Sequence, residues 1–446
     1  MFLRPDLRPG APPLDASPAE VRPDSEPVGD RDDPDHPMAD QGVEPAVDAG
    51  QDGRDGAPPG PVEPPPDPML VGPFGPDPRR CDGDDAYIPP LDRCLSARRV
   101  DDLPADRAGH AALPLLDGQV LVVGGFGASL SPVDVLGGTA VYAPAEDRWH
   151  RGPVLLRAVS EAALIALDDG TALVLGGRGE VVEARVQRVL PEAGGCEEAG
   201  ALATARRGGV SLPFGDSVVV IGGRRRDGQP LGAELFDLDE KSEPLGPMGV
   251  PRAEHVALRT PMGEALAFGG RDASQRVRFA PERLDARSRE WVAVPGPAEW
   301  AFAEGAAASV PDGVIFAGGV DEEGHWLQRA GRLDPVTGRW EAVGGLMAPR
   351  AGLTLTPIGG AGAALAFGAG DDEPAVELYV PEGRRFVTAR VPAEVLADRI
   401  EHAASALPDG AVLISGGQAS GRPVRHVVRL ALYAPREVDP MIEREE

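Results

Sequence analysis

A pair of adjacent glycines follows a short β-branched run at nearly regular intervals along this chain. The seven copies are about 46 to 52 residues apart, and one of them is degraded. They stand at Gly124-Gly125, Gly176-Gly177, Gly222-Gly223, Gly269-Gly270, Gly318-Gly319, Gly368-Ala369-Gly370 (the degraded copy) and Gly416-Gly417. A repeat of this length is typical of units that cannot bury an apolar face alone and must stack on their neighbours. The chain is therefore expected to fold as a tandem array.

The residues before each pair predict a β-hairpin. In the first copy, small and apolar residues over 110–116 are followed by Asp117-Gly118 and then by the β-branched run 120–123. Asp-Gly supplies the positive-φ positions of a two-residue hairpin turn. The turn recurs at Asp169-Gly170, Asp312-Gly313 and Asp409-Gly410.

Other positions repeat in phase with the glycines. The first strand of a copy is preceded by an arginine in six copies and by Phe302 in the fifth; the arginines are Arg107, Arg157, Arg206, Arg252, Arg350 and Arg399. Histidine follows three residues later in three copies, at His110, His255 and His402. Downstream, VYAPAEDRW (141–149), RLDARSREW (283–291), RLDPVTGRW (332–340) and LYVPEGRRF (378–386) each predict a third strand, a turn and a fourth strand opened by an aromatic residue.

Together these features resemble the Kelch repeat, over residues 107 to about 435. The resemblance implies an all-β, seven-bladed Kelch-type β-propeller with four strands per blade. Copper radical oxidases also use Kelch-type propellers, but their site needs a Cys–Tyr crosslink. The only cysteine inside the repeats is Cys196, at an outer-strand position, so no oxidase site, cofactor or metal is expected.

The last repeat predicts how the ring closes. It supplies three strands, over 402–406, 411–415 and 427–433, and no fourth. The segment 96–106 aligns with the fourth strand of the other copies, so an N-terminal strand is expected to complete the last blade and remove free sheet edges. The expected domains are an acidic, proline-rich disordered tail over 1–80, the propeller over 81–437 and a polar tail over 438–446.

Composition restricts partners and compartment. The chain carries a net charge of −27, which repels nucleic acid and anionic membrane surfaces. It shows no apolar signal sequence at its start and no apolar run long enough to span a membrane. The stalk-like tail resembles the spacers of exported bacterial domains, so the cell envelope or secretion is expected, with the cytoplasm as the alternative. A monomer is expected.

Three cysteines leave two interpretations open. Cys81 and Cys94 bracket a short loop where the tail ends and would form a disulfide in an oxidising compartment, with Cys196 left over. Free thiols are the alternative. Two cysteines without further ligands nearby do not make a zinc site.

Candidate ligand residues lie where the start of strand one and the end of strand two meet on one face. Arginines follow the glycines of copies two to four, at Arg178, Arg224, Arg225, Arg226 and Arg271, and acidic residues follow those of copies five and six, at Asp321, Glu322, Glu323, Asp371, Asp372 and Glu373. One side of this face is expected to be basic and the other acidic. Arginines bind carboxylates or phosphates bidentately, and Trp300 offers a stacking surface for a sugar. The repeated histidines are expected to make a structural hydrogen bond. Glu254, Glu304 and Glu401 precede the equivalent position in three copies and are expected to line the channel mouth.

Two functions fit this set. The first is a non-enzymatic binding module that presents the loop face to a protein or glycan, without catalytic residues. The second is an isomerase of an anionic sugar that resembles the Kelch-type sialic acid mutarotases, in which arginines hold the carboxylate and Glu254 or Glu304 moves a proton. The candidate ligand-binding residues are Arg178, Arg224, Arg252, Glu254, His255, Arg271, Trp300 and Glu304.

Overall fold

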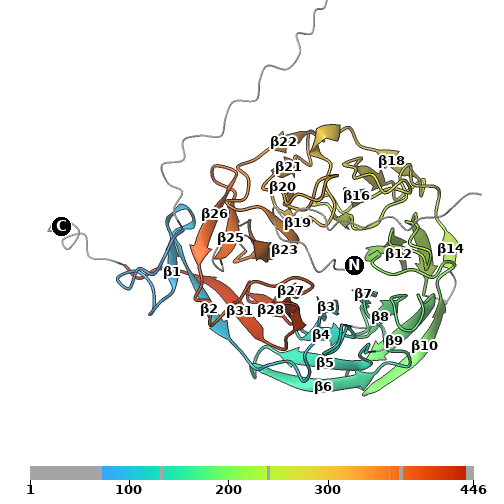
Figure 1. Cartoon of the computed structure of the whole chain (residues 1–446), viewed down its shortest axis with the longest axis horizontal. Helices are drawn as coiled ribbons and strands as arrows, with labels where there is room; N and C mark the ends of the chain where they lie inside the picture. The colour runs from blue at the N-terminus through green and yellow to red at the C-terminus, as the bar shows by residue number, and fades with distance from the viewer. Residues whose placement is uncertain (1–72, 131–133, 239–241, 361, 371–374, 438–446) are drawn as a thin grey trace, which may run out of the picture. The chain divides into compact units, whose positions relative to one another are not determined.

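The computed structural model describes residues 73–130, 134–238, 242–360, 362–370 and 375–437. In this part of the chain, seven antiparallel sheets stand around a central axis as the blades of a β-propeller (Figure 1). Each blade has its first strand next to the axis and its fourth at the rim. The all-β, seven-bladed fold expected from the repeats is confirmed. The expected tail 438–446 and most of the expected tail 1–80 lie outside the described residues.

Six of the blades are four-stranded meanders, and the seventh has five strands. Blade 1 contains β3 (Ala111–Pro114), β4 (Val120–Val123), β5 (Gly138–Ala143) and β6 (Arg148–Val154). Blade 2 contains β7 (Ala163–Ala166), β8 (Ala172–Leu175), β9 (Arg185–Leu190) and β10 (Gly195–Ala201). Blade 3 contains β11 (Val210–Phe214), β12 (Ser217–Ile221), β13 (Glu234–Asp237) and β14 (Ser242–Pro244). Blade 4 contains β15 (Val256–Arg259), β16 (Ala265–Phe268), β17 (Glu282–Leu284) and β18 (Trp291–Ala293).

The remaining blades follow the same plan. Blade 5 contains β19 (Ala306–Val310), β20 (Gly313–Ala317), β21 (Ala330–Leu333) and β22 (Trp340–Ala342), preceded by the 3-10 turn η2 (Ala298–Trp300). Blade 6 contains β23 (Arg350–Ile358), β24 (Ala363–Gly370), β25 (Ala375–Val380) and β26 (Arg385–Arg390). Blade 7 contains β27 (Ala403–Ala406), β28 (Val412–Ser415), β31 (Val427–Tyr433), β2 (Arg93–Arg99) and β1 (Ala86–Ile88). A short ribbon of β29 (Gln418–Ala419) and β30 (Arg422–Pro423) and the turn η1 (Pro89–Leu91) complete the set.

The second strand of a blade is apolar along its whole length because neighbouring blades cover both of its faces. Every residue of β4, β8, β16, β20 and β28 is buried. Continuous apolar runs of this kind are expected for strands packed on both sides, whereas strands with one wet face alternate. The repeated β-branched runs of the sequence therefore form the layers between the blades.

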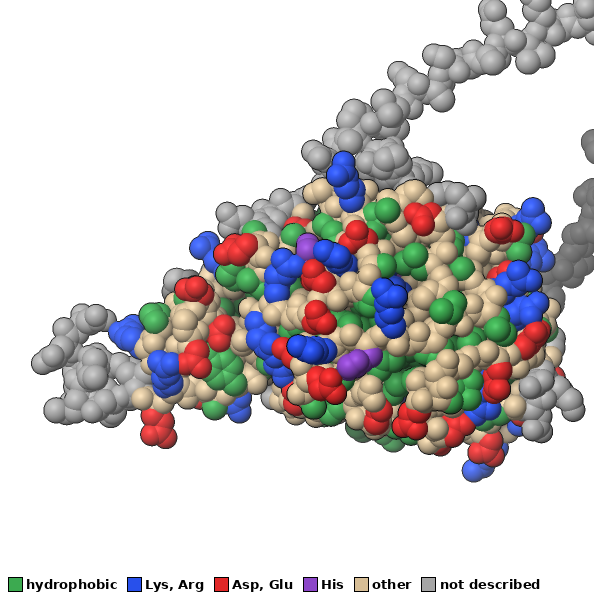
Figure 2. Space-filling view, turned by 90° about the horizontal axis from the view of Figure 1, so that it is seen from below, with side chains coloured by type: hydrophobic (Ala, Val, Ile, Leu, Met, Phe, Trp, Pro, Cys, Tyr) green, Lys and Arg blue, Asp and Glu red, His purple; other side chains and the backbone are tan. Residues whose placement is uncertain are grey.

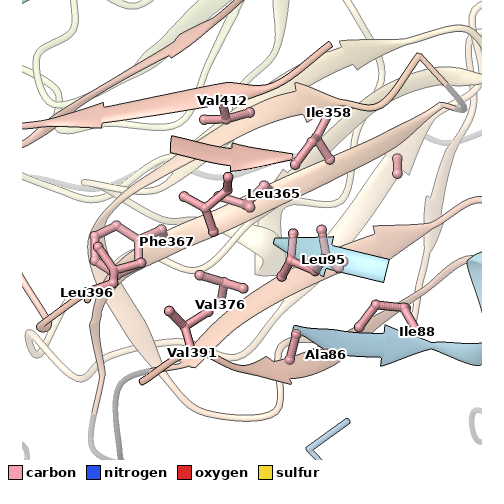
Figure 3. Close-up of a cluster of buried hydrophobic side chains, with 14 of the residues drawn as sticks. Ala86, Ile88, Leu95, Ile358, Leu365, Phe367, Val376, Val391, Leu396 and Val412 are labelled. Carbon is pink, nitrogen blue, oxygen red and sulfur yellow. The ribbon is translucent and has the colours of Figure 1, made fainter. Parts of the chain in front are cut away.

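The N-terminal strand closes the ring, as the repeat count predicts. Strand β2 pairs antiparallel with β31, and Leu95 lies opposite Leu432. Strand β1 adds a fifth strand outside β2. Ala86, Ile88 and Leu95 enter the same apolar cluster as residues of blades 6 and 7 (Figure 3). The closing segment is therefore part of the core.

Contacts between the N-terminal segment and the propeller begin before residue 81. The backbone of Phe74 accepts a hydrogen bond from Arg390 and donates one to Thr388 on β26. The Cys81–Cys94 disulfide, with a Cα–Cα distance of 5.7 Å, then joins this segment to β2. Cys196 is the free cysteine of the described residues.

Replacing both Cys81 and Cys94 by serine is expected to lower the free energy of unfolding by about 3 kcal/mol, because the crosslink restricts a short loop of the unfolded chain. Urea unfolding under non-reducing conditions measures the change. Cys196→Ser is the matched control, since it removes a thiol outside the disulfide. Equal midpoints for the double variant and the control would contradict a stabilising disulfide.

Five of the arginines that precede the first strands form a repeated buried element. Each is at most 3% exposed and donates from Nη1 to the carbonyl of the first glycine of the repeated glycine pair, at 2.8 to 3.2 Å. These arginines are Arg107, Arg206, Arg252, Arg350 and Arg399. The guanidinium thus joins the start of the first strand to the end of the second strand within one blade.

The sixth predicted member, Arg157, does not occupy this position. Its side chain is exposed, and the equivalent position is held by the buried Val159, whose carbonyl accepts a hydrogen bond from Gly125. The carbonyls of Arg206 and Arg252 accept the corresponding bonds from Gly177 and Gly223. The sequence interpretation of Arg157 was wrong because it placed the second repeat two residues out of register.

At one position of the third strand, a buried glutamate is present only in blades that also have the buried arginine. Three of the five arginines pair with a glutamate on the third strand, as Arg206–Glu234, Arg252–Glu282 and Arg350–Glu377. At the same strand position, blade 2 has Gln187 and blade 5 has Gly331. These are the two blades without the arginine, so neither leaves a buried charge unpaired, which would be strongly destabilising.

Candidate functional site

Seven equivalent residues, one per blade, form a ring around the mouth of the central channel. All seven have a left-handed backbone, with φ between 52° and 63°. They are Gly109, Glu161, Gly208, Glu254, Glu304, Gly352 and Glu401. Hydrogen bonds from one blade to the next join them, for example Glu161 N to Gly109 O at 3.0 Å and Glu304 N to Glu254 O at 3.0 Å. The ring fixes the backbone from which the glutamate side chains extend.

Four members of this ring are glutamates although the conformation favours glycine. A non-glycine residue in the left-handed region costs on the order of 1 kcal/mol, and three blades avoid this cost by using glycine. Glu254, Glu304 and Glu401 were expected at the channel mouth, and the structure places them there. Glu161 was missed, because the register error at Arg157 moved it out of alignment. The spacing from Val159 to Gly176, which matches the spacing from Arg107 to Gly124, would have revealed it.

The ring encloses a cavity of about 330 Å³. All four ring glutamates line it, together with Arg207, Arg224 and the imidazoles of His110, His255 and His402. The backbone segments before the first strand and after the double glycine pair on this face, as at Arg207–Arg224 and Ala253–Arg271. The shared face predicted from the meander is therefore present, and its centre is hollow.

Two of the glutamates are neutralised by arginines. Glu254 accepts from Arg224 Nη2 at 2.8 Å and from Arg271 Nε at 3.2 Å. Glu161 pairs with Arg207 at 2.5 Å, and both side chains are buried. Arg224 and Arg271, which were expected to hold a ligand anion, therefore already bind a carboxylate of the protein. Their ligand-binding role stays a prediction.

The other two glutamates lie in an environment that opposes ionisation. Burial, followed by the nearby Glu254 carboxylate, raises the pKa of Glu304 to about 7. Burial also raises the pKa of Glu401 to about 7, and the charges of Glu161 and Glu304 act in the same direction. These two carboxyls therefore change their protonation state near neutral pH. Glu254, in contrast, forms ion pairs with two guanidinium groups.

The repeated histidines are buried between blades and neutral. His110 bonds to Ser415 Oγ at 3.1 Å and His402 to Thr354 Oγ1 at 2.9 Å, each on the neighbouring blade. The predicted structural hydrogen bond is thus present at two of the three positions. His255 instead packs against Gly222, and burial lowers its pKa to about 3.

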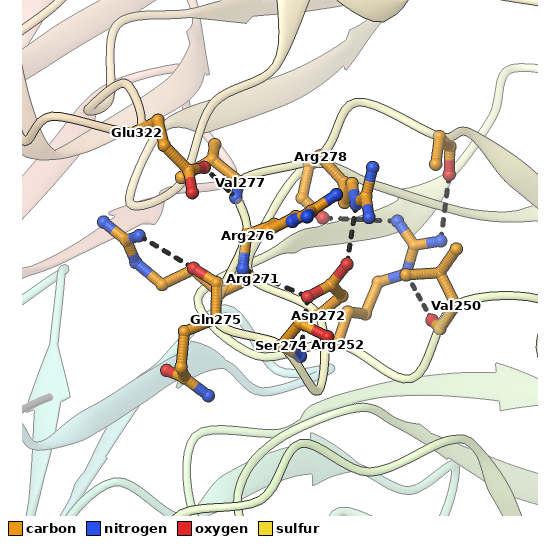
Figure 4. A network of polar contacts seen from close by, with 12 residues as sticks. Val250, Arg252, Arg271, Asp272, Ser274, Gln275, Arg276, Val277, Arg278 and Glu322 are labelled. Atoms are coloured by element: carbon orange, nitrogen blue, oxygen red, sulfur yellow. Dashed lines mark hydrogen bonds and ion pairs between the residues drawn. The ribbon is translucent and has the colours of Figure 1, made fainter. Parts of the chain in front are cut away.

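The loop of blade 4 is fixed by its own charges. Asp272 accepts hydrogen bonds from Ser274 N, Arg276 N and Arg278 Nε, at 2.7 to 3.0 Å (Figure 4). Arg252 lies in the same view but donates to backbone carbonyls and to the buried Glu282, so this candidate ligand residue is placed in the core. The loop presents a rigid surface beside the channel mouth.

Two further candidates lie away from the cavity. Trp300 packs into an aromatic cluster, 5.9 Å from Phe279 and 5.7 Å from Phe316 between ring centroids, and does not line the channel mouth. Arg178 forms a backbone bridge with Ser160 on the loop face.

The structure describes only some of the residues that were expected to make one side of the loop face basic and the other acidic. Asp371, Asp372 and Glu373 lie outside the described residues. Arg225 pairs with Asp227 at 2.9 Å, and Glu322 accepts from Val277 N at 2.6 Å. Figure 2 views the molecule edge-on and shows basic and acidic side chains interspersed along the rim. Local pairing therefore offsets much of the charge contrast expected from the loops.

A comparison with protein-family models gives no match, and a comparison with curated proteins gives no significant match. The structure itself shows a seven-bladed β-propeller. No helix in the described part of the chain is long and apolar enough to cross a membrane.

Proposed function

We propose that this protein is a non-enzymatic binding module that takes its ligand at the channel mouth of the loop face. The observation that carries the proposal is the convergence of charged side chains from several blades on one cavity of about 330 Å³. The left-handed glutamates support it, because four blades accept backbone strain in order to place a carboxyl there. The Kelch-like repeat supports the same use of the loop face for a protein or glycan.

The alternative, an isomerase of an anionic sugar, has one supporting observation. Burial and the nearby Glu254 carboxylate raise the pKa of Glu304 to about 7, and a carboxyl that titrates near the working pH suits general acid–base chemistry. The substrate carboxylate would have to displace Glu254 from Arg224 and Arg271, which already bind it at 2.8 and 3.2 Å. Binding without turnover is therefore the better-supported function.

The disulfide favours an oxidising compartment, because such bonds persist outside the reducing cytosol. We therefore include export to the cell envelope or medium in the proposal. Determining the redox state of Cys81 and Cys94 in protein isolated from its natural source tests this part.

A thermal-shift screen of the full chain tests the binding function. Neutral sugars, sugar acids, alkylamines and short basic or acidic peptides are the probes. At least one class is expected to raise the melting temperature, since a ligand at 100 times its Kd stabilises by about 2.7 kcal/mol. Glu254→Gln or Glu304→Gln, each in the cavity wall, is expected to abolish the shift, and Asp227→Asn, an exposed carboxylate outside the cavity wall, to preserve it.

Two results would overturn the proposal. If no class stabilises the protein, or if Glu254→Gln and Glu304→Gln both leave the shift unchanged, the channel mouth is not the ligand site. If N-acetylneuraminic acid exchanges its anomers faster with the protein than without it, as followed by NMR, the protein is an enzyme.

A further inference from the structure

The channel mouth contains a buried hydrogen-bond acceptor that no described side chain satisfies. Glu304 Oε2 is covered from solvent and has no hydrogen-bond partner. Within the described residues, no arginine or lysine forms an ion pair with Glu304 or Glu401. Buried polar atoms are normally paired, so the Glu304 carboxyl oxygen indicates a missing donor.

We propose that the channel mouth binds a primary ammonium group, such as a lysine side chain or an alkylamine, between the carboxyl groups of Glu304 and Glu401. This inference rests on the binding function proposed above and names its ligand class. An ammonium carries three N–H donors and no acceptor, which matches a cavity that lacks donors at these positions. Its alkyl stem would leave through the open side of the cavity.

The arginines of the cavity wall argue against an anion. Arg207, Arg224 and Arg271 each pair with a glutamate of the ring, so an anionic ligand would have to break an existing pair. A cation meets no such competition at Glu304 and Glu401. A guanidinium fits less well, because its flat fork matches one carboxylate bidentately, whereas these two carboxyls approach from blades 5 and 7.

A divalent metal ion also fits less well. Calcium needs six to eight oxygen ligands at short distance. Among the described residues, the group of acidic and histidine side chains whose ligand atoms converge within 4.8 Å is Asp321, Glu323 and His325, on an exposed loop. The ring glutamates do not belong to such a group, so the cavity does not bring together the three or more oxygen ligands that a divalent ion needs.

Binding of an ammonium is expected to release protons. Glu304 and Glu401 both have a pKa of about 7, and a positive ligand favours their ionised forms. The other charged or titratable groups that line or adjoin the cavity are Glu161, Glu254, Arg207, Arg224, Arg271, His110, His255 and His402. From pH 6 to pH 8 the affinity should rise about tenfold if one carboxyl must ionise and about 100-fold if both must, since the amine keeps its proton up to about pH 10.

Isothermal titration of the full chain with n-butylamine at pH 6 and pH 8 tests the proposal, with n-butanol as the neutral probe of similar shape. We expect binding of the amine alone, tighter at pH 8, with heats that depend on the buffer because protons are released. Glu304→Gln and Glu401→Gln should each weaken binding at least tenfold and flatten the pH dependence. Glu323→Gln removes the same charge from the same face outside the cavity and should leave binding unchanged.

The results that overturn the ammonium site differ from those that overturn the binding function. No heat with butylamine at pH 8, equal binding of butanol, displacement of the amine by calcium, or binding unaffected by both glutamine variants would each reject it. If a sugar or sugar acid binds with dependence on Glu254 while butylamine does not, the channel mouth is a ligand site of another class. If no probe binds at the channel mouth, both proposals fail.

Discussion

Replacing Arg252 by valine is expected to lower the free energy of unfolding by about 3–5 kcal/mol. The guanidinium is fully buried, donates to three backbone carbonyls and pairs with Glu282, which is itself buried. Removing one partner of a buried pair leaves an uncompensated charge, which costs more than the pair contributes. Urea unfolding at unchanged m-value measures the loss.

The second blade shows how the loss should be reversed. There, Gln187 accepts a hydrogen bond from Arg157 N at 2.8 Å and donates to Arg157 O at 3.1 Å. In the fourth blade the same two backbone positions are served by Glu282 and Arg252, which bond to Val250 N and Val250 O. One neutral amide thus replaces an ion pair.

The double variant Arg252→Val, Glu282→Gln reproduces the arrangement of Val159 and Gln187. It is expected to recover most of the stability lost in Arg252→Val, because no buried charge remains. If the double variant is as unstable as the single one, the unpaired carboxylate is not the cause of the loss.

Replacing Glu304 by glutamine is expected to stabilise the protein at pH 8 by about 3 kcal/mol. The folded-state pKa of about 7 lies above the usual value of 4.5, so the folded state holds this proton more tightly than the unfolded state. The contribution of this carboxyl is therefore fully present below pH 4.5 and is lost as the pH rises through 7. Glutamine does not titrate and avoids the loss.

Unfolding midpoints at pH 5 and pH 8 measure the effect. The difference between Glu304→Gln and the natural chain should be small at pH 5 and large at pH 8. Glu264→Gln, on an exposed ion pair with Arg283, is the control and should show neither change. A variant that is equally or less stable than the natural chain at pH 8 would contradict the raised pKa and the idea that Glu304 is kept at the expense of stability.

The ring glutamates that support the proposed function lower the stability of the folded protein. Gly109, Gly208 and Gly352 show that the left-handed position needs no side chain for folding. Glu304 and Glu401 add both backbone strain and unfavourable ionisation. Local costs of this kind are concentrated at functional sites, which is why the channel mouth and not the rim carries the proposed site.

The sequence alone determined the number of blades, the closing strand and most strand positions. Residues 120–123 and 427–433 were predicted with the observed bounds, because paired glycines, Asp-Gly turns and apolar runs are local requirements of the backbone. Because the strands of each repeat follow the same order, the absence of a fourth strand in the last repeat was visible in the sequence. That strand could therefore be assigned to the N-terminal segment.

The tertiary structure alone decided which side chains share the channel mouth and which charges remain unpaired. Contacts between blades pair Arg224 and Arg271 with Glu254. They also bury Trp300 among aromatic rings and place Glu161 in the cavity wall. No repeat motif encodes such contacts, because each ring residue comes from a different blade and only closure of the ring brings them together. Whether a carboxyl is paired, and therefore ionised, is fixed by its neighbours in space.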